Sequence, residues 1–328
     1  MRLIRGQAGR AAVPGGAVVT IGKFDGLHRG HRMLIAAAGR EARRRRLPLV
    51  LLSFEPQPEE FFGGRLPRLS RFVTKWRLVE ETGQVQIFAC LRFDRNLARQ
   101  KAEDFVHHVL VEGLQARGVV VGEGFRFGAE RRGDIALLQR LGRVHGFTVK
   151  AVAPVVLAGS RVSSSRVRQA LFAHRFDEVY RLLGRPYRLY GRVIRGDQIG
   201  KTLGFPTANM ALGRRPPPLA GIYVVRVEGM PGGLRHGLAN VGTRPTLGVK
   251  GRRLLEVYLP RWRGPLYGDL LGVDFLTHLR PETNFRGLSP LVDAMREDER
   301  RGARWLAEHN LAWGTPVAEG QEQRSQNA

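Results

Sequence analysis

The spacing of apolar runs changes half-way along this chain of 328 residues, and that change constrains the fold more than any other feature. In the first half, short apolar runs alternate with segments of helical periodicity, which is typical of a parallel sheet covered by helices. The expected strands are 18–21, 49–54, 86–91 and 118–121, and the expected helices are 30–46, 101–113 and 134–145. The first half is therefore predicted to be α/β.

From about residue 189 the apolar runs are bounded by Gly and Pro, with no helical segment between them. Regular spacing of this kind favours an antiparallel barrel or sandwich. The expected strands are YRLYGRVI, GIYVVRVEG, RHGLANVG, RLLEVYLP and LGVDFLTHL, followed by an amphipathic helix over 288–309. We expect one domain over 1–184, a second over 185–313, and a polar, disordered tail over 314–328.

A formal net charge of +25 suggests a nucleic-acid partner, because a basic surface attracts phosphate. Only six of the 54 basic residues are lysine, however, and the arginines are scattered without interleaved aromatic side chains. We interpret the charge as a background that helps to hold anionic nucleotides, and expect no nucleic-acid partner.

The sequence contains no long uncharged apolar run, and its amino terminus lacks the apolar core of a secretory signal. Its single cysteine, Cys90, cannot form an intrachain disulfide, which agrees with a reducing compartment. These features predict a cytoplasmic protein without a membrane partner. We expect it to be a monomer or a weak oligomer.

Two histidines lie three residues apart in GKFDGLHRGH, directly after the first expected strand. Ligands of a parallel sheet bind at the carboxyl ends of its strands, where a helix amino terminus attracts anions. His28 and His31 share one helix face, so both can reach an anion held there. A zinc site is the rival interpretation, but the glutamate of an HExxH motif is absent and no third ligand is obvious nearby. A purely structural histidine pair is a further alternative.

A second phosphate-binding signal is RVSSSRVRQAL, residues 161–171, where hydroxyls lead into a helix that carries Arg166 and Arg168. Together with HxGH it resembles the motifs of the nucleotidyltransferase superfamily. This resemblance implies that the histidines and serines hold the triphosphate of ATP.

A third signal is GDQIGKTLGFPTANM, residues 196–210. GDQIGKT fails the Walker A pattern by one residue, although its glycine-rich backbone could still cradle phosphate. Pro206 fixes the chain just before Thr207, whose hydroxyl suits Mg²⁺, and Asn209 projects to the same side of an extended segment.

From about residue 18 to residue 308 the chain resembles the bacterial bifunctional riboflavin kinase/FMN adenylyltransferase (FAD synthetase) family. The matching stretches are TIGKFDGLHRGH, SFEPQPEEFF, RFDRNLARQKAEDFV, GFRFGAERRGDIALL, RVSSSRVRQAL, LLGRPYRLYGRVIRGDQIGKTLGFPTANM, GLANVGTRPTLG, LEVYLPRWRGPLYGDLLGVDF and LRPETNF. The resemblance implies a Rossmann-like nucleotidyltransferase domain followed by an antiparallel β-barrel riboflavin kinase domain. It implies phosphorylation of riboflavin to FMN and adenylylation of FMN to FAD with release of pyrophosphate, both with ATP and Mg²⁺.

The resemblance also implies roles for individual residues. Glu256, His28 and His31 would be catalytic, with Glu256 as the base for the ribityl hydroxyl, and Thr207 and Asn209 would hold the metal. The remaining residues would bind ATP (Gly22, Asp25, Gly30, Ser164, Ser165, Arg168, Gly200 and Thr202) or flavin (Phe54, Phe125, Phe127, Arg280 and Glu282).

Three positions depart from the family pattern. Gly124 stands where Asp or Asn is usual, Tyr258 where His is usual, and Gln57 where His is frequent. Two other functions stay open at this point. One is a nucleotidyltransferase acting on another substrate, such as a phosphopantetheine or glycerol phosphate, and the other is a nucleic-acid binder without catalysis. GFPTAN and Glu256 count against the first, and the retained histidines count against the second.

Overall fold

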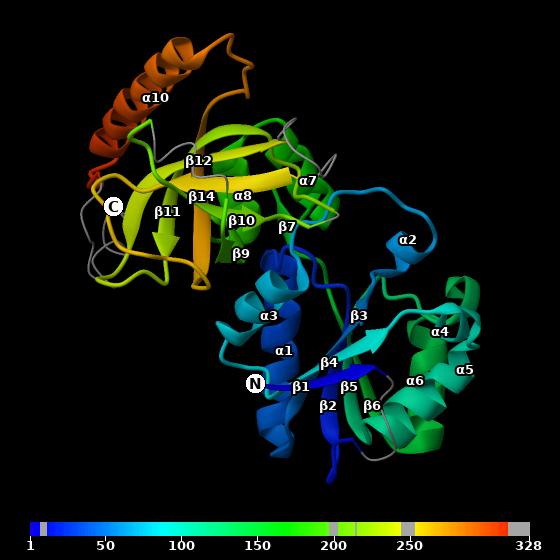
Figure 1. Ribbon diagram of the computed structural model, residues 1–328. Coiled ribbons are helices and arrows are strands. Elements are labelled where there is room, and N and C mark those ends of the chain that lie inside the picture. Colours follow the sequence, from blue (N-terminus) through cyan, green and yellow to red (C-terminus); the bar gives the residue numbers. More distant parts are fainter. Residues whose placement is uncertain (7–11, 197–202, 214, 244–252, 314–328) are drawn as a thin grey trace. The chain divides into compact units, whose positions relative to one another are not determined.

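A computed structural model describes residues 1–6, 12–196, 203–213, 215–243 and 253–313 (Figure 1). By its internal contacts the chain divides into two compact units, one made of Met1–Leu66 and Lys75–Ser164 and the other of Pro67–Thr74 and Ser165 onwards. Each unit is described by itself. The expected tail, 314–328, lies outside the described residues.

The first unit is built on a six-stranded parallel sheet with the spatial order β1-β4-β3-β2-β5-β6. Its strands are β1 (Arg2–Gly6), β2 (Ala17–Ile21), β3 (Leu49–Glu55), β4 (Ile87–Arg92), β5 (Ala116–Gly122) and β6 (Thr148–Val152). All five residues of β2 are buried, as expected for a central strand that is covered on both faces. The four strands expected from the sequence are confirmed.

Helices lie on both sides of this sheet (Figure 1). They are α1 (Arg29–Arg45), α2 (Pro58–Phe61), α3 (Phe72–Glu80), α4 (Arg95–Arg99), α5 (Ala102–Phe105), η1 (Val106–Gly113), η2 (Ala129–Arg131) and α6 (Ile135–His145), and a small hairpin of β7 (Val156–Leu157) and β8 (Ser160–Arg161) follows. Two expectations need correction. Strands β1 and β6 were not expected, and because β1 comes first, the run 118–121 belongs to the fifth strand rather than the fourth. The helix expected over 101–113 is a short α-helix that continues as the π-helix η1.

The second unit contains α7 (Ser164–Phe172), α8 (Phe176–Leu183), a closed antiparallel barrel and α10 (Leu288–Glu308). The barrel strands are β9 (Tyr187–Ile194), β10 (Thr207–Ala211), β11 (Gly221–Glu228), β12 (Arg235–Thr243), β13 (Arg253–Tyr258) and β14 (Leu270–Arg280). Of the two architectures expected, a barrel or a sandwich, the barrel is confirmed. Helix α8 packs on β9 and β14 and therefore belongs to the same compact unit as the barrel. The domain boundary at residue 184 stays a prediction.

Alternation along the barrel strands separates two faces of the wall. Leu255 and Val257 of β13 are buried, and they pair with the buried residues Val241 and Ala239 of β12. These side chains fill the inside of the barrel. Because successive residues of a strand point to opposite faces, Glu256 lies on the outer face of the wall.

An ion network is buried between three barrel strands. The carboxylate of Asp274 is 2% exposed and accepts hydrogen bonds from two guanidinium groups. The nitrogen to oxygen distances are 2.6 and 2.7 Å to Arg188, and 2.6 and 3.0 Å to Arg226. The network joins β9, β11 and β14 and satisfies charges that could not remain buried alone.

Replacing Asp274 by alanine is expected to lower the free energy of unfolding of the barrel by ~3–5 kcal/mol, because both guanidinium groups lose the buried carboxylate of Asp274, although Arg188 still contacts Glu228. Chemical denaturation followed by circular dichroism measures the change. Asp293→Ala is the matched control, since Asp293 is 69% exposed and its contact with Arg296 is 3.9 Å long. A loss equal to that of the control would contradict a structural role for the network.

Candidate active sites

A cavity of about 890 Å³ opens at the carboxyl ends of the parallel strands in the first unit. Its walls include the predicted flavin-binding residues Phe54, Phe125 and Phe127, together with Gly22 at the end of β2. The rings of Phe125 and Phe127 are stacked, with centroids 5.4 Å apart. Phe62, Phe93 and Phe105 extend the aromatic lining. The cavity is large enough for a drug-sized ligand, and its walls suit a flat aromatic ring system.

The predicted histidine pair lies at the amino terminus of α1, and the helix begins where the sequence indicated. His28 is the N-cap, and its Nδ1 accepts a hydrogen bond from the backbone N–H of His31 at 3.3 Å. The two rings are stacked with their centroids 3.7 Å apart, so both lie on one face of the helix as predicted. A Cβ at Gly30 would stand 3.2 Å from the His28 ring, so glycine leaves space for this arrangement.

Burial keeps both imidazoles neutral. Burial, and then the nearby guanidinium of Arg161, lowers the pKa of His28 to about 4. The pKa of His31 is held well below its usual value by burial first, then by His28 and by the cations Lys75, Lys23 and Arg161. Because Nδ1 of His28 accepts a hydrogen bond, the proton of its neutral ring is on Nε2, where it can be donated to an anion. The histidines therefore offer hydrogen-bond donors rather than positive charge.

Cations around this pair were missed by sequence reasoning. Arg161 lines the cavity, and Lys75 is buried, with its Nζ 3.4 Å from the hydroxyl of Ser53. Arg161 is the first residue of RVSSS. Its place in this predicted phosphate-binding motif could have identified it. Lys75 carries no such signal, since only the fold brings it close to His31.

Gly124 also lines the cavity, and there is room for a side chain at this position. A Cβ at this position would lie 3.4 Å from Nη1 of Arg161. The space that a polar side chain would occupy in the usual family pattern therefore borders on the Arg161 guanidinium.

The remaining predicted ATP-binding residues are placed as follows. Ser164 donates a hydrogen bond from its hydroxyl to the backbone carbonyl of Asp25 at 3.0 Å, within the first unit. Ser165 is exposed in the first turn of α7, and Arg168 donates from Nε to the carbonyl of Pro67 at 2.6 Å. Gly200 and Thr202 lie outside the described residues.

A second cavity, of about 280 Å³, lies on the outer face of the barrel wall and is bordered by α10. It brings together the predicted residues Thr207, Glu256, Arg280 and Glu282. Strand register explains the grouping, because Asn209 of β10 and Asn240 of β12 pair with Glu256 from either side. Asn209 is 4% exposed and lies in the same row, although it is not part of the cavity wall.

Asn240 is a further polar group of this row that the sequence analysis missed, because only the pairing of β12 with β13 places it beside Glu256. Within the described parts of the chain, the side-chain oxygens of Asn209 and Asn240 are buried without a hydrogen-bond partner. Such oxygens are suited to a hard cation or to a polar substrate.

Side chains that border the cavity fasten helix α10 over it. The guanidinium of Arg280 binds the carboxylate of Asp298 through two hydrogen bonds of 2.7 Å, and Asp298 is 3% exposed. The hydroxyl of Tyr258 donates to Glu299 at 3.2 Å, while burial and then that carboxylate raise its pKa to about 12. Arg280 thus borders the cavity and also holds the helix that closes one side of it.

Comparison with known proteins assigns a family to each half of the chain. A family model described as FAD synthetase matches residues 11–166, and a second, described as riboflavin kinase, matches residues 183–306. The chain belongs to the bifunctional riboflavin kinase/FMN adenylyltransferase family. It is 42% identical to the protein of that name from Escherichia coli strain K12, over 91% of this chain and 96% of the relative. It is 41% identical to the Pseudomonas fluorescens protein, with the same coverage.

Among solved structures, the chain is similar to a Streptococcus pneumoniae protein described as a macrolide-efflux protein. The TM-score is 0.76 at 28% identity, covering 93% of this chain and 100% of the other. In the described parts of the chain, no helix is long and apolar enough to cross a membrane. Membership of the flavin family makes this chain a kinase and a nucleotidyltransferase, with the adenylyltransferase domain first and the kinase domain second.

Proposed function

We propose that the outer wall of the barrel phosphorylates riboflavin, with Glu256 as the base. The attacking ribityl hydroxyl must lose its proton as its oxygen bonds to the γ-phosphorus of ATP and the bond to the β-phosphate oxygen breaks. A carboxylate in the wall of a cavity can take that proton. The observation that carries this proposal is the strand register that places Asn209, Glu256 and Asn240 side by side. Arg280 and Glu282 border the same cavity and would contact the flavin.

We propose Mg²⁺ as the metal of this step, held by Thr207 and Asn209. The fit rests on the buried side-chain oxygen of Asn209, which accepts no hydrogen bond from the described residues, and on the hydroxyl of Thr207 two residues earlier on the same face of β10. When bound, the ion would spread the negative charge of the phosphates.

The cavity of the first unit is proposed to bind FMN beside ATP. Phe54, Phe125 and Phe127 would hold the flavin ring, while Gly22, Asp25, Gly30 and Ser164 of the same unit would contact ATP. The family resemblance also assigns ATP binding to Ser165 and Arg168. A phosphate oxygen of FMN attacks the α-phosphorus of ATP, and the bond to the pyrophosphate oxygen breaks. Such a reaction depends on position and charge neutralisation. The neutral His28 and His31 would donate hydrogen bonds to the phosphates, and Arg161 would supply positive charge.

Location in the cytoplasm, a monomeric or weakly oligomeric state and the lack of a nucleic-acid partner are part of the proposal. The location is supported by the supply of ATP in that compartment and by the single cysteine, Cys90, which is buried. A nucleotidyltransferase for another substrate is not supported, because the riboflavin kinase model matches the second half of the chain.

The test is a time course with purified protein, riboflavin and ATP, with the flavins separated chromatographically. We expect FMN to appear first and FAD later, and both to be lost when EDTA removes the metal and to return with Mg²⁺. The absence of any flavin product would contradict both proposals. FMN without FAD would show that the kinase operates while the adenylyltransferase site, with its Gly124, does not.

A further inference from the structure

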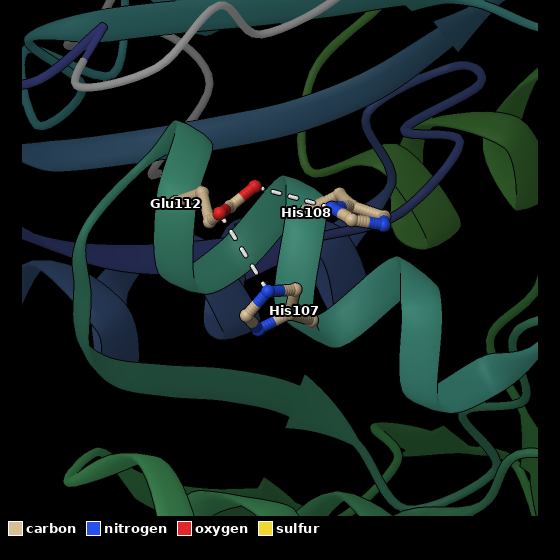
Figure 2. A group of neighbouring side chains, drawn as sticks. All are labelled: His107, His108 and Glu112. Atoms are coloured by element: carbon tan, nitrogen blue, oxygen red, sulfur yellow. Dashed lines mark hydrogen bonds and ion pairs between the residues drawn. The ribbon is translucent and has the colours of Figure 1, made fainter.

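Three side chains that are common metal ligands converge on η1. His107, His108 and Glu112 line neither of the two cavities described above. Figure 2 shows both imidazoles turned toward the carboxylate of Glu112. One ligand atom from each of the three lies within 4.8 Å of the others. We propose that this cluster, here called the η1 cluster, is a binding site for a divalent transition-metal ion such as Zn²⁺.

The η1 cluster depends on the π-helical register. In an α-helix each residue turns by 100°, so residues five apart point about 140° away from each other. A π-helix pairs residue i with residue i+5, and the backbone N–H of Leu114 accordingly donates to the carbonyl of Val109 at 3.0 Å. This register brings His107 above Glu112, five residues later, while His108 approaches the same carboxylate from four residues away. Local π-helices are rare in proteins, and many of those that occur lie at functional sites.

Two of the distances are close to those between neighbouring ligand atoms of a tetrahedral ion. Zinc bonds to histidine nitrogen and carboxylate oxygen are about 2.0–2.2 Å long, so neighbouring ligand atoms lie ~3.4 Å apart. Nε2 of His107 is 3.6 Å from one carboxylate oxygen of Glu112, and Nδ1 of His108 is 3.1 Å from the other. Two imidazoles and a carboxylate are also the ligand types that suit zinc and its neighbours in the periodic table.

The position of the η1 cluster allows an ion to enter and be held. The side chains of His107 and His108 are 48% and 56% exposed, so a hydrated ion can reach them. The opposite face of η1 is fixed, because Val106, Val109 and Leu110 are buried in the core. The ring of His145, at the end of α6, lies 5.7 Å from that of His107 and would supply a fourth ligand after a small rotation, or water would complete the site.

The proposal is tested by titrating Zn²⁺ into protein purified without a histidine tag, against a chromophoric chelator of known affinity. We expect one site whose affinity falls at least ~10-fold in His107→Ala, in His108→Ala and in Glu112→Gln. Two controls are expected to keep it: His309→Ala, which removes an exposed histidine directly after α10, and His28→Ala, which removes one member of another close histidine pair. With Co²⁺ in place of Zn²⁺, the visible spectrum of a tetrahedral complex should appear in the wild type and not in the double variant His107→Ala/His108→Ala.

A second readout uses stability, because an ion that binds only the folded state raises the melting temperature. Zn²⁺ should raise it for the wild type and for His309→Ala, but not for the double variant. Circular dichroism verifies that the double variant is folded, and Glu112→Gln replaces it if it is not. Equal zinc affinity in the wild type and in the folded ligand variants would overturn the proposal. A wild-type site that disappears in His28→Ala would also overturn it, since the ion would then bind at α1.

Discussion

Replacing Glu256 by glutamine should nearly abolish FMN formation and leave the adenylylation of FMN close to its wild-type rate. Glutamine has almost the same volume as glutamate and can still pack between Asn209 and Asn240, but it cannot take a proton. Loss of a general base typically costs ~10²–10⁴-fold in rate. We therefore expect kcat for riboflavin phosphorylation to fall by that factor while KM for riboflavin changes little.

The two activities are measured separately, with riboflavin and ATP in one assay and FMN and ATP in the other. FMN adenylylation reports on the first unit only, because the two cavities are formed by different compact units, so circular dichroism is used to show that the barrel of the variant is folded. Glu308→Gln, a change at the last residue of α10, is the matched control and should preserve both rates. Equal loss of both activities in folded Glu256→Gln would contradict the assignment, and so would a fall of less than tenfold in the kinase rate.

The sequence predicts the central elements of the fold because their apolar runs are unambiguous. Strands β2, β3, β4 and β5 are buried nearly throughout, so each appears as a continuous hydrophobic segment. Strand β1 lies at the edge of the sheet, where its sequence RLIRG leaves Arg2 and Arg5 exposed. An edge strand does not need a full apolar pattern, and β1 was therefore missed.

The π-helical register of η1 could not be predicted either. The segment 101–113 has helical periodicity, but the choice between pairing with residue i+4 and residue i+5 depends on how Val106, Val109 and Leu110 fit the core. For this reason the sequence did not indicate that His107 and Glu112 meet.

The residues of the candidate sites also differ in whether the sequence alone predicts them. Motif residues such as His28 and His31 are close in sequence, so their shared helix face followed from spacing alone. Asn240 and Asp298 become part of a site only through strand pairing and through the packing of α10. Side chains that meet through long-range register carry no local signal, and only the family resemblance singled out Glu256 in advance.

Replacing His28 or His31 by alanine should lower the rate of FAD formation by ~10²–10³-fold, because each removes a preorganised donor to the phosphates. FMN formation should be unaffected. His309→Ala is the control, since His309 lies at the end of α10 and lines neither cavity. An unchanged rate of FAD formation in both variants would leave the pair with a structural role only.

The protonation state of the pair gives this prediction a second, independent test. Burial and Arg161 lower the pKa of His28 from 6.5 to about 4, and burial also holds the pKa of His31 well below its usual value. Between pH 4 and pH 6.5 the unfolded chain therefore binds more protons at His28 than the folded chain does. The contribution of the neutral ring to the free energy of unfolding is fully present above about pH 6.5 and is lost as the pH drops toward 4. Nuclear magnetic resonance of the histidine rings, assigned with the two variants, should show neither ring titrating near neutral pH. Titration of either ring near pH 6.5 would mean that the pair presents charge to ATP, and the role of neutral donors would have to be abandoned.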